Sequence, residues 1–191
     1  MLRSILIMTT LASSSSVMGK EISYDYIQGG FINTLGSDPV PDGEGFEFSG
    51  SFSVMSNIAI TAGYERTDFD ERSGIDVDTA TYDLGVTAHN STIAPGASLF
   101  VNLSVLGGEV EASDGAYKYD TGYAVTLGLR SMVTDIFEIN TALSREDLFD
   151  DHDALFGFEG RIYTSEKVSF GAGYVVSRNA ESLEFNARVN F

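Results

Sequence analysis

Residues 182–191 read SLEFNARVNF and decide the fold class, because polar and apolar side chains alternate through the whole stretch. Successive side chains of a β-strand point to opposite faces, so this alternation predicts a strand with one apolar and one polar face. Chain termini usually fray, and this much order at the last residue requires a structural reason. The apolar face consists of Leu183, Phe185, Ala187, Val189 and Phe191.

The same alternation recurs along the chain between turn-forming residues. Residues 46–54, 123–129 and 168–176 keep their apolar side chains at every second position without error. The first segment is the least regular, because Tyr24 and Tyr26 indicate one frame while Ile27 and Phe31 indicate the other. We expect ten strands, over residues 22–36, 45–55, 58–68, 77–89, 98–110, 120–132, 136–147, 154–164, 167–178 and 181–191.

The composition excludes several classes of protein. The 191 residues contain 28 acids and 11 Lys plus Arg, a net charge of −17 that argues against nucleic-acid binding through phosphates. The absence of cysteine excludes disulfides and thiolate metal sites. With 20 Gly, 3 Pro, 13 Phe and 9 Tyr, the chain favours many short strands over helices.

The first twenty residues, MLRSILIMTTLASSSSVMGK, differ from the rest. Arg3 is followed by a short apolar run over 5–11 and by small residues before position 20. This order is typical of a secretory signal peptide, and the alternative is an ordinary buried helix. We expect residues 1–19 to be a signal peptide and residues 20–191 to form one β domain.

Three features favour a transmembrane β-barrel over a soluble β-sandwich. Most predicted strands have about ten residues or more, which is the length that crosses a bilayer at a tilt. The connections alternate between short turns, such as 55–57 and 132–135, and longer acidic stretches, such as 69–76 and 111–119. Outward aromatic residues form two expected girdles, one of Phe48, Tyr64, Tyr123, Phe156 and Tyr174 and one of Phe137, Phe170 and Phe191.

The final strand also resembles the assembly signal of bacterial outer-membrane β-barrel proteins. In that class the last strand ends on an aromatic residue, with apolar residues at every second position before it, as in residues 183–191. The resemblance implies an antiparallel barrel in the bacterial outer membrane, surrounded by lipid and lipopolysaccharide and inserted by the barrel assembly machinery. The OmpX and OmpA barrel families have eight strands; ten is favoured here, because only the first segment is doubtful and the number must be even.

The inward residues predict a polarised lumen. Acids at the outer mouth are Glu47, Glu65 and Glu184, and Asp83 and Glu159 lie below them. Arginines gather near the periplasmic end, at Arg130, Arg161 and Arg188, together with Glu138. The lumen of a ten-stranded barrel is narrow, so we expect water and an ionic network that largely plug it.

Hairpin geometry refines this picture. A turn centred on Thr134 places Arg130 directly opposite Glu138, an attractive cross-strand pair. A turn centred on Ser56 places Glu47 opposite Glu65, a repulsive one, and pairs Phe48 with Tyr64 outside.

The sequence gives only weak evidence for a catalytic site at the rim of the barrel. Asp150-x-His152 and Asp68-x-Asp70 have the spacings of the omptin proteases, which are ten-stranded outer-membrane barrels, but a solvated acidic loop is the favoured interpretation. The acidic loops also suggest nonspecific binding of divalent cations, without a defined metal site or cofactor. We expect a non-enzymatic envelope protein with a structural or interaction role. The alternatives are a narrow cation-preferring pore and an omptin-like rim endopeptidase.

Overall fold

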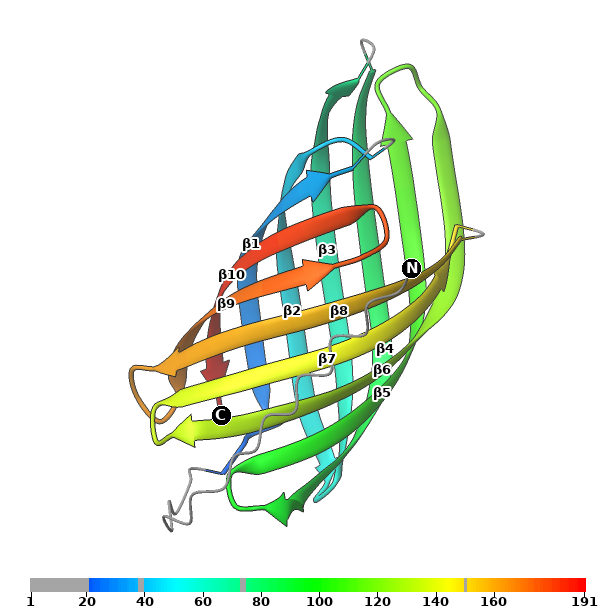
Figure 1. Ribbon diagram of the computed structural model, residues 1–191. Helices are drawn as coiled ribbons and strands as arrows, with labels where there is room; N and C mark the ends of the chain where they lie inside the picture. Colours follow the sequence, from blue (N-terminus) through cyan, green and yellow to red (C-terminus); the bar gives the residue numbers. More distant parts are fainter. Residues whose placement is uncertain (1–20, 38–39, 73–74, 150) are drawn as a thin grey trace, which may run out of the picture.

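The computed structural model describes residues 21–37, 40–72, 75–149 and 151–191, so the predicted signal peptide at 1–19 lies outside the described residues. The chain forms a closed barrel in which each strand pairs with its sequence neighbours and β1 pairs with β10 (Figure 1). The described residues include no helix that is long and apolar enough to cross a membrane. The strands are β1 (Tyr26–Gly36), β2 (Gly43–Met55), β3 (Ile58–Arg72), β4 (Ile75–Ala94), β5 (Ala97–Ala112), β6 (Tyr117–Thr134), β7 (Phe137–Leu148), β8 (Asp151–Tyr163), β9 (Val168–Val176) and β10 (Ala180–Asn190).

The antiparallel barrel with ten strands is confirmed, and the eight-stranded alternative is wrong. The doubtful first segment pairs along its whole length with β10, from Tyr26 opposite Asn190 to Gly36 opposite Ala180. Closure leaves no unpaired strand edge, which is the condition for a sheet to exist in lipid. The regular alternation of SLEFNARVNF therefore belongs to the strand that closes the barrel.

The predicted long loops are shorter than expected. Residues 69–76 and 111–119 are mostly strand, because β3 runs to Arg72, β4 starts at Ile75, and β5 and β6 are joined only by 113–116. Figure 1 shows that β3 to β6 extend farther at this end of the barrel than β1, β9 and β10. We call this end the outer end, and the end with the short turns 56–57, 95–96 and 135–136 the periplasmic end.

The outside of the barrel is apolar and the inside is polar. Phe31, Val105 and Phe185 are among many large apolar side chains that are exposed on the outer face. The buried side chains are mostly polar or charged, and they include Arg130, Glu138 and Arg161. This inversion of a soluble protein is the arrangement that a lipid solvent requires.

The first described residues do not extend β1 as predicted. Residues 22–25 turn into the periplasmic end of the barrel, where Ile22 and Tyr24 are each 6% exposed. They pack with Ala59, Met132 and Tyr163, and Phe100 packs against this cluster. The two frames in the first segment have one explanation: even-numbered residues face inward and odd-numbered residues face lipid, and both faces carry apolar side chains.

Candidate functional site: the barrel lumen

A buried ion pair lies at the centre of the periplasmic end of the lumen. Arg130 Nε donates to Glu138 Oε1 at 2.7 Å, and Arg130 Nη2 donates to Glu138 Oε2 at 3.2 Å. The Tyr163 hydroxyl donates to the same Oε2 at 2.6 Å. Glu138 is 1% exposed and Arg130 is 4% exposed, so water screens this pair very little.

The predicted pair exists, but its predicted register is wrong. Arg130 lies opposite Asn140, and Glu138 lies opposite Met132 on β6 and Arg161 on β8. An irregularity between Met132 and Thr134 shifts the hairpin. The two charged side chains therefore meet on a diagonal, which long side chains can span.

The other two arginines converge on a glutamine of β1. Gln28 Oε1 accepts a hydrogen bond from Arg161 Nη2 at 2.8 Å and from Arg188 Nε at 2.9 Å. Arg161 Nη2 also donates to Asn186 Oδ1 at 2.7 Å and pairs with Glu159. The Arg188 guanidinium lies 4.1 Å from the centre of the Tyr26 ring, in a cation–π contact.

Glycine makes room for this network on β9. A Cβ atom at Gly171 would collide with the Glu159 carboxylate and with the Asn186 amide oxygen. A larger residue there would displace the groups that hold Arg161, so the inward glycine is part of the site.

The inward-turned segment 22–25 packs into the periplasmic end of the lumen. The Tyr24 ring stacks on His89 with ring centres 3.8 Å apart, and its hydroxyl lies 3.0 Å from Ser98 Oγ. Burial raises the pKa of the Tyr24 hydroxyl, so this side chain stays neutral. Arg130 Nη1 donates to the Ser23 carbonyl at 2.8 Å, which ties the segment to the buried ion pair.

The upper lumen is acidic and hollow. Two cavities of about 310 Å³ and 330 Å³ share Glu65 and Glu146 in their lining. Glu47 and Asp83 line the first cavity, and Glu184 lines the second. These side chains lie above the arginines, so the predicted separation of charge along the lumen agrees with the placement of the described residues.

The predicted carboxylate pair is present in the register. Glu47 lies opposite Glu65, and Phe48 lies opposite Tyr64 on the outer face. Gln28 Nε2 donates to Glu47 Oε1 at 3.1 Å, which connects the upper acids to the arginine network. The Thr67 hydroxyl donates to Glu65 Oε1 at 3.3 Å.

Replacing Glu65 with glutamine should stabilise the barrel. The change removes the repulsion across β2 and β3 and keeps an oxygen that Thr67 can reach, so we expect a gain of about 0.2–1 kcal/mol in the free energy of unfolding. Urea unfolding of the refolded protein in detergent micelles measures this quantity. Glu111→Gln, at an exposed position on β5, is the matched control, and a loss of stability specific to Glu65→Gln would contradict the repulsion.

Sequence reasoning missed several members of the site. Glu146 follows the inward frame that starts at Glu138, so the alternation of β7 itself could have revealed it. Gln28 and Asn186 also occupy inward positions, but a neutral amide gives no signal of a network in the sequence. The alternation around Tyr24 indicates only one of two conflicting frames and gives no sign of its contacts in the lumen.

At the outer rim, His152 lies beside an aspartate of the neighbouring strand. His152 Nδ1 lies 3.0 Å from Asp147 Oδ2, across β7 and β8. Asp150 lies outside the described residues. Arg66 engages Asp68 at 3.3 Å and Asp78 at 2.9 Å. No group of His, Asp and Glu side chains in the described ranges is arranged to hold a metal ion.

The residues of the expected assembly signal share the lipid-facing side of the closing strand. Leu183, Phe185, Val189 and Phe191 are exposed there, at positions that alternate with inward Glu184, Asn186 and Arg188. Recognition of these residues by assembly machinery stays a prediction.

Comparison with known proteins identifies the fold. No family model and no curated protein matches the chain. Among solved structures, the NanC porin is similar with a TM-score of 0.55 at 7% identity, over 87% of this chain and 100% of that one. The translocator domain of the autotransporter NalP from Neisseria meningitidis is similar with a TM-score of 0.52 at 12% identity, over 91% of each chain.

The chain has the fold of outer-membrane β-barrels. Ail, the attachment invasion locus protein of Yersinia pestis, also matches, with a TM-score of 0.49 at 16% identity over 88% of this chain and 100% of that one. The closed barrel and its apolar exterior are the features that place the protein in the bacterial outer membrane, where lipid surrounds it. At these identities the likeness concerns the fold alone, and the lumen has to supply the argument for function.

Proposed function

We propose that this outer-membrane barrel has no enzymatic activity and presents an acidic, cation-attracting vestibule to the outside above a closed periplasmic floor. The observation that carries the proposal is the packing of Ile22 and Tyr24 into the periplasmic end of the lumen. Together with the buried arginine network, this segment occupies the path that ions would need. The protein then serves as a structural or interaction component of the envelope.

The charge distribution supports a role for the vestibule. Carboxylates in a cleft with low-dielectric walls raise the local concentration of cations. The acidic outer hairpins extend this field, and divalent cations that bridge lipopolysaccharide are its expected partners, bound nonspecifically. Insertion by the barrel assembly machinery belongs to the same proposal. Cofactors and nucleic acid have no part in it.

Two alternatives remain as outcomes of experiment. A narrow cation-preferring pore is the second candidate, because the two upper cavities provide an acidic path into the lumen. The rim endopeptidase has no supporting observation among the described residues, in which His152 Nδ1 lies beside Asp147 Oδ2 on the neighbouring strand. Incubation of the refolded protein with a peptide library tests that alternative directly, and cleavage lost in His152→Ala would revive it.

Planar-bilayer recording tests the closed floor. We expect the unmutated protein to insert without a large steady conductance, because the floor is filled by residues 22–25 and by three arginine side chains that repel cations. Insertion is verified by the different gel migration of boiled and unboiled samples, which reports a folded barrel. A large, steady, cation-selective conductance in verified barrels would refute the floor and establish the pore.

A further inference from the structure

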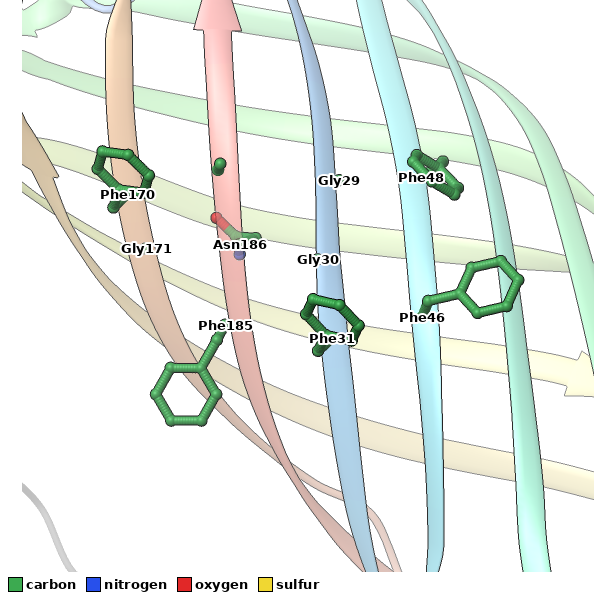
Figure 2. A pocket seen from close by; sticks show the side chains of 10 residues that line it. Gly29, Gly30, Phe31, Phe46, Phe48, Phe170, Gly171, Phe185 and Asn186 are labelled. Atoms are coloured by element: carbon green, nitrogen blue, oxygen red, sulfur yellow. The ribbon is translucent and has the colours of Figure 1, made fainter.

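An open depression of about 850 Å³ lies on the outside of the barrel, where β10 closes against β1 (Figure 2). This volume is within the range of pockets that bind small molecules. The wall around it is formed by β9, β10, β1 and β2. Its lining is Gly29, Gly30, Phe31, Phe46, Phe48, Phe170, Gly171, Phe185, Asn186 and Ala187.

The strand register explains why the surface is hollow here. Gly29 lies opposite Ala187 on one side and Phe48 on the other, and Ala187 lies opposite Phe170. Two small residues at the closing seam are thus flanked by two phenylalanines. A Cβ atom at Gly29 would lie 3.0 Å from Cε1 of Phe48, so the bare backbone lets this ring lean over the seam.

A second row of aromatic side chains bounds the depression toward the outer end. Phe31 lies opposite both Phe46 and Phe185. Figure 2 shows these rings along one edge and Phe48 and Phe170 along the other. Toward the periplasmic end, Ile27 pairs with Val189, and both are exposed. The outward side chains on every border of the depression are therefore apolar.

The surrounding lipid determines what fills such a hollow. The depression is continuous with the apolar exterior that contacts the membrane, so its neighbours are hydrocarbon chains and not water. If the hollow were empty, the side chains that line it would lose their dispersion contacts on that side. A single acyl chain is flexible and narrow enough to lie between the rings.

Position along the strands indicates the leaflet. Gly29 is the fourth residue of β1, and Ala187 is separated from the end of β10 by only two residues. At about 3.3 Å per residue and a tilt of about 45°, this row lies roughly 7 Å above the periplasmic ends of the two strands. The depression therefore falls in the periplasmic half of the wall, where the chains belong to phospholipids.

A basic residue lies at the rim below the depression. Val168 starts β9 opposite Val189, and Lys167 precedes it on the exposed turn between β8 and β9. The Lys167 carbonyl accepts a hydrogen bond from Asn190 N at 2.7 Å, which fixes this turn beside the closing strand. The ammonium group of Lys167 complements a lipid phosphate, in a chain with only 11 Lys plus Arg against 28 acids.

We propose that this depression binds one acyl chain of a periplasmic-leaflet phospholipid, with the phosphate of that lipid beside Lys167. The site holds its lipid longer than the rest of the barrel surface does, because the chain contacts rings on several sides. The inference is independent of what the lumen does.

Photocrosslinking tests the site. The protein is refolded into phosphatidylcholine vesicles that contain a small fraction of phosphatidylglycerol with a diazirine on one acyl chain. Mass spectrometry should locate labels on Phe31, Phe48, Phe170 and Phe185 at least about threefold above the level on exposed Leu84, Leu103 and Leu127, a difference of about 0.6 kcal/mol in local affinity.

Matched variants separate this site from general lipid contact. Ala187→Phe fills the depression and should lower labelling there about threefold, whereas Ala62→Phe, the same change on the exposed face of β3, should leave it unchanged. Ala187→Leu serves if the larger side chain prevents folding. Lys167→Gln should reduce the preference for the phosphatidylglycerol probe over a phosphatidylcholine probe with the same diazirine.

Three results would overturn the proposal. Equal labelling around the barrel would mean that only ordinary lipid contact occurs. Protein–protein crosslinks through the same phenylalanines, without lipid label, would assign the depression to a second copy of the chain. If Lys167→Gln left the preference for the phosphatidylglycerol probe unchanged, the lipid phosphate would not lie beside Lys167.

Discussion

Replacing Glu138 with alanine is expected to lower the free energy of unfolding by about 3–5 kcal/mol. The variant leaves the Arg130 guanidinium buried without its bidentate partner and removes the Glu138 carboxylate as an acceptor for the Tyr163 hydroxyl. A buried charge without a counterion loses far more than a surface charge does, because water cannot replace the lost contacts. Equilibrium urea unfolding of the refolded barrel measures the loss.

A double-mutant cycle separates the interaction from the cost of truncation. Arg130→Ala should be costly for the same reason, and the double variant should recover part of the loss because neither charge then remains unpaired. The pair of Arg66 and Asp78 is the matched control: its two side chains are 44% and 40% exposed, and truncating Arg66 should cost less than about 1 kcal/mol. Strict additivity of Arg130→Ala and Glu138→Ala would show that the two residues do not interact.

The barrel itself was predictable, because its determinants are local. Alternation within 182–191 and 168–176 depends only on the period of a strand, and lipid outside the barrel enforces that period on every strand. The inward positions of Arg130, Arg161 and Arg188 follow from the same parity. To predict that Glu47 lies opposite Glu65, only one further quantity was needed, which is the centre of the short turn between their strands.

The details that the sequence did not predict depend on contacts across the lumen. The prediction that Arg130 lies directly opposite Glu138 was wrong, because an irregularity near Met132 shifts the register of the hairpin. The alternation of side chains does not indicate this shift. Residues 22–25 were expected to continue β1, and they turn inward because Ile22 and Tyr24 find an apolar pocket formed by Ala59, Met132 and Tyr163. These partners are distant in the chain, so no local pattern announces them.

The depression at the seam, on the lipid-facing side of the barrel wall, also depends on residues that are distant in the chain. Phe46, Phe48, Phe170 and Phe185 were predictable as lipid-facing residues, whereas Phe31 lies in the segment where two frames conflict. The hollow arises only because Gly29 and Ala187 become neighbours when the barrel closes. Strand closure is therefore what converts two ordinary small residues into the floor of a candidate site.

Replacing Arg130, Arg161 and Arg188 together with serine should produce the largest change in ion passage. In the proposed closed floor the three guanidinium groups oppose cations: Gln28 joins Arg161 and Arg188, and Glu138 pairs with Arg130. Serine removes both the bulk and the positive charge, and it leaves the carboxylates of the vestibule and of Glu138 along the path. We expect a steady conductance that is selective for cations, measured by planar-bilayer recording under a salt gradient.

The exterior arginines supply the matched control for this variant. Arg66, Arg145 and Arg178 are exposed, and their joint replacement with serine makes the same change in net charge outside the lumen. This control should remain closed, since surface charge alone does not open the floor. If the triple lumen variant fails to show the gel shift of a folded barrel, the double replacement of Arg161 and Arg188 retains the pair of Arg130 and Glu138 and tests the same path. A folded lumen variant that conducts anions in preference to cations would refute the assignment of charge, and one that stays closed would show that residues 22–25 seal the floor without the arginines.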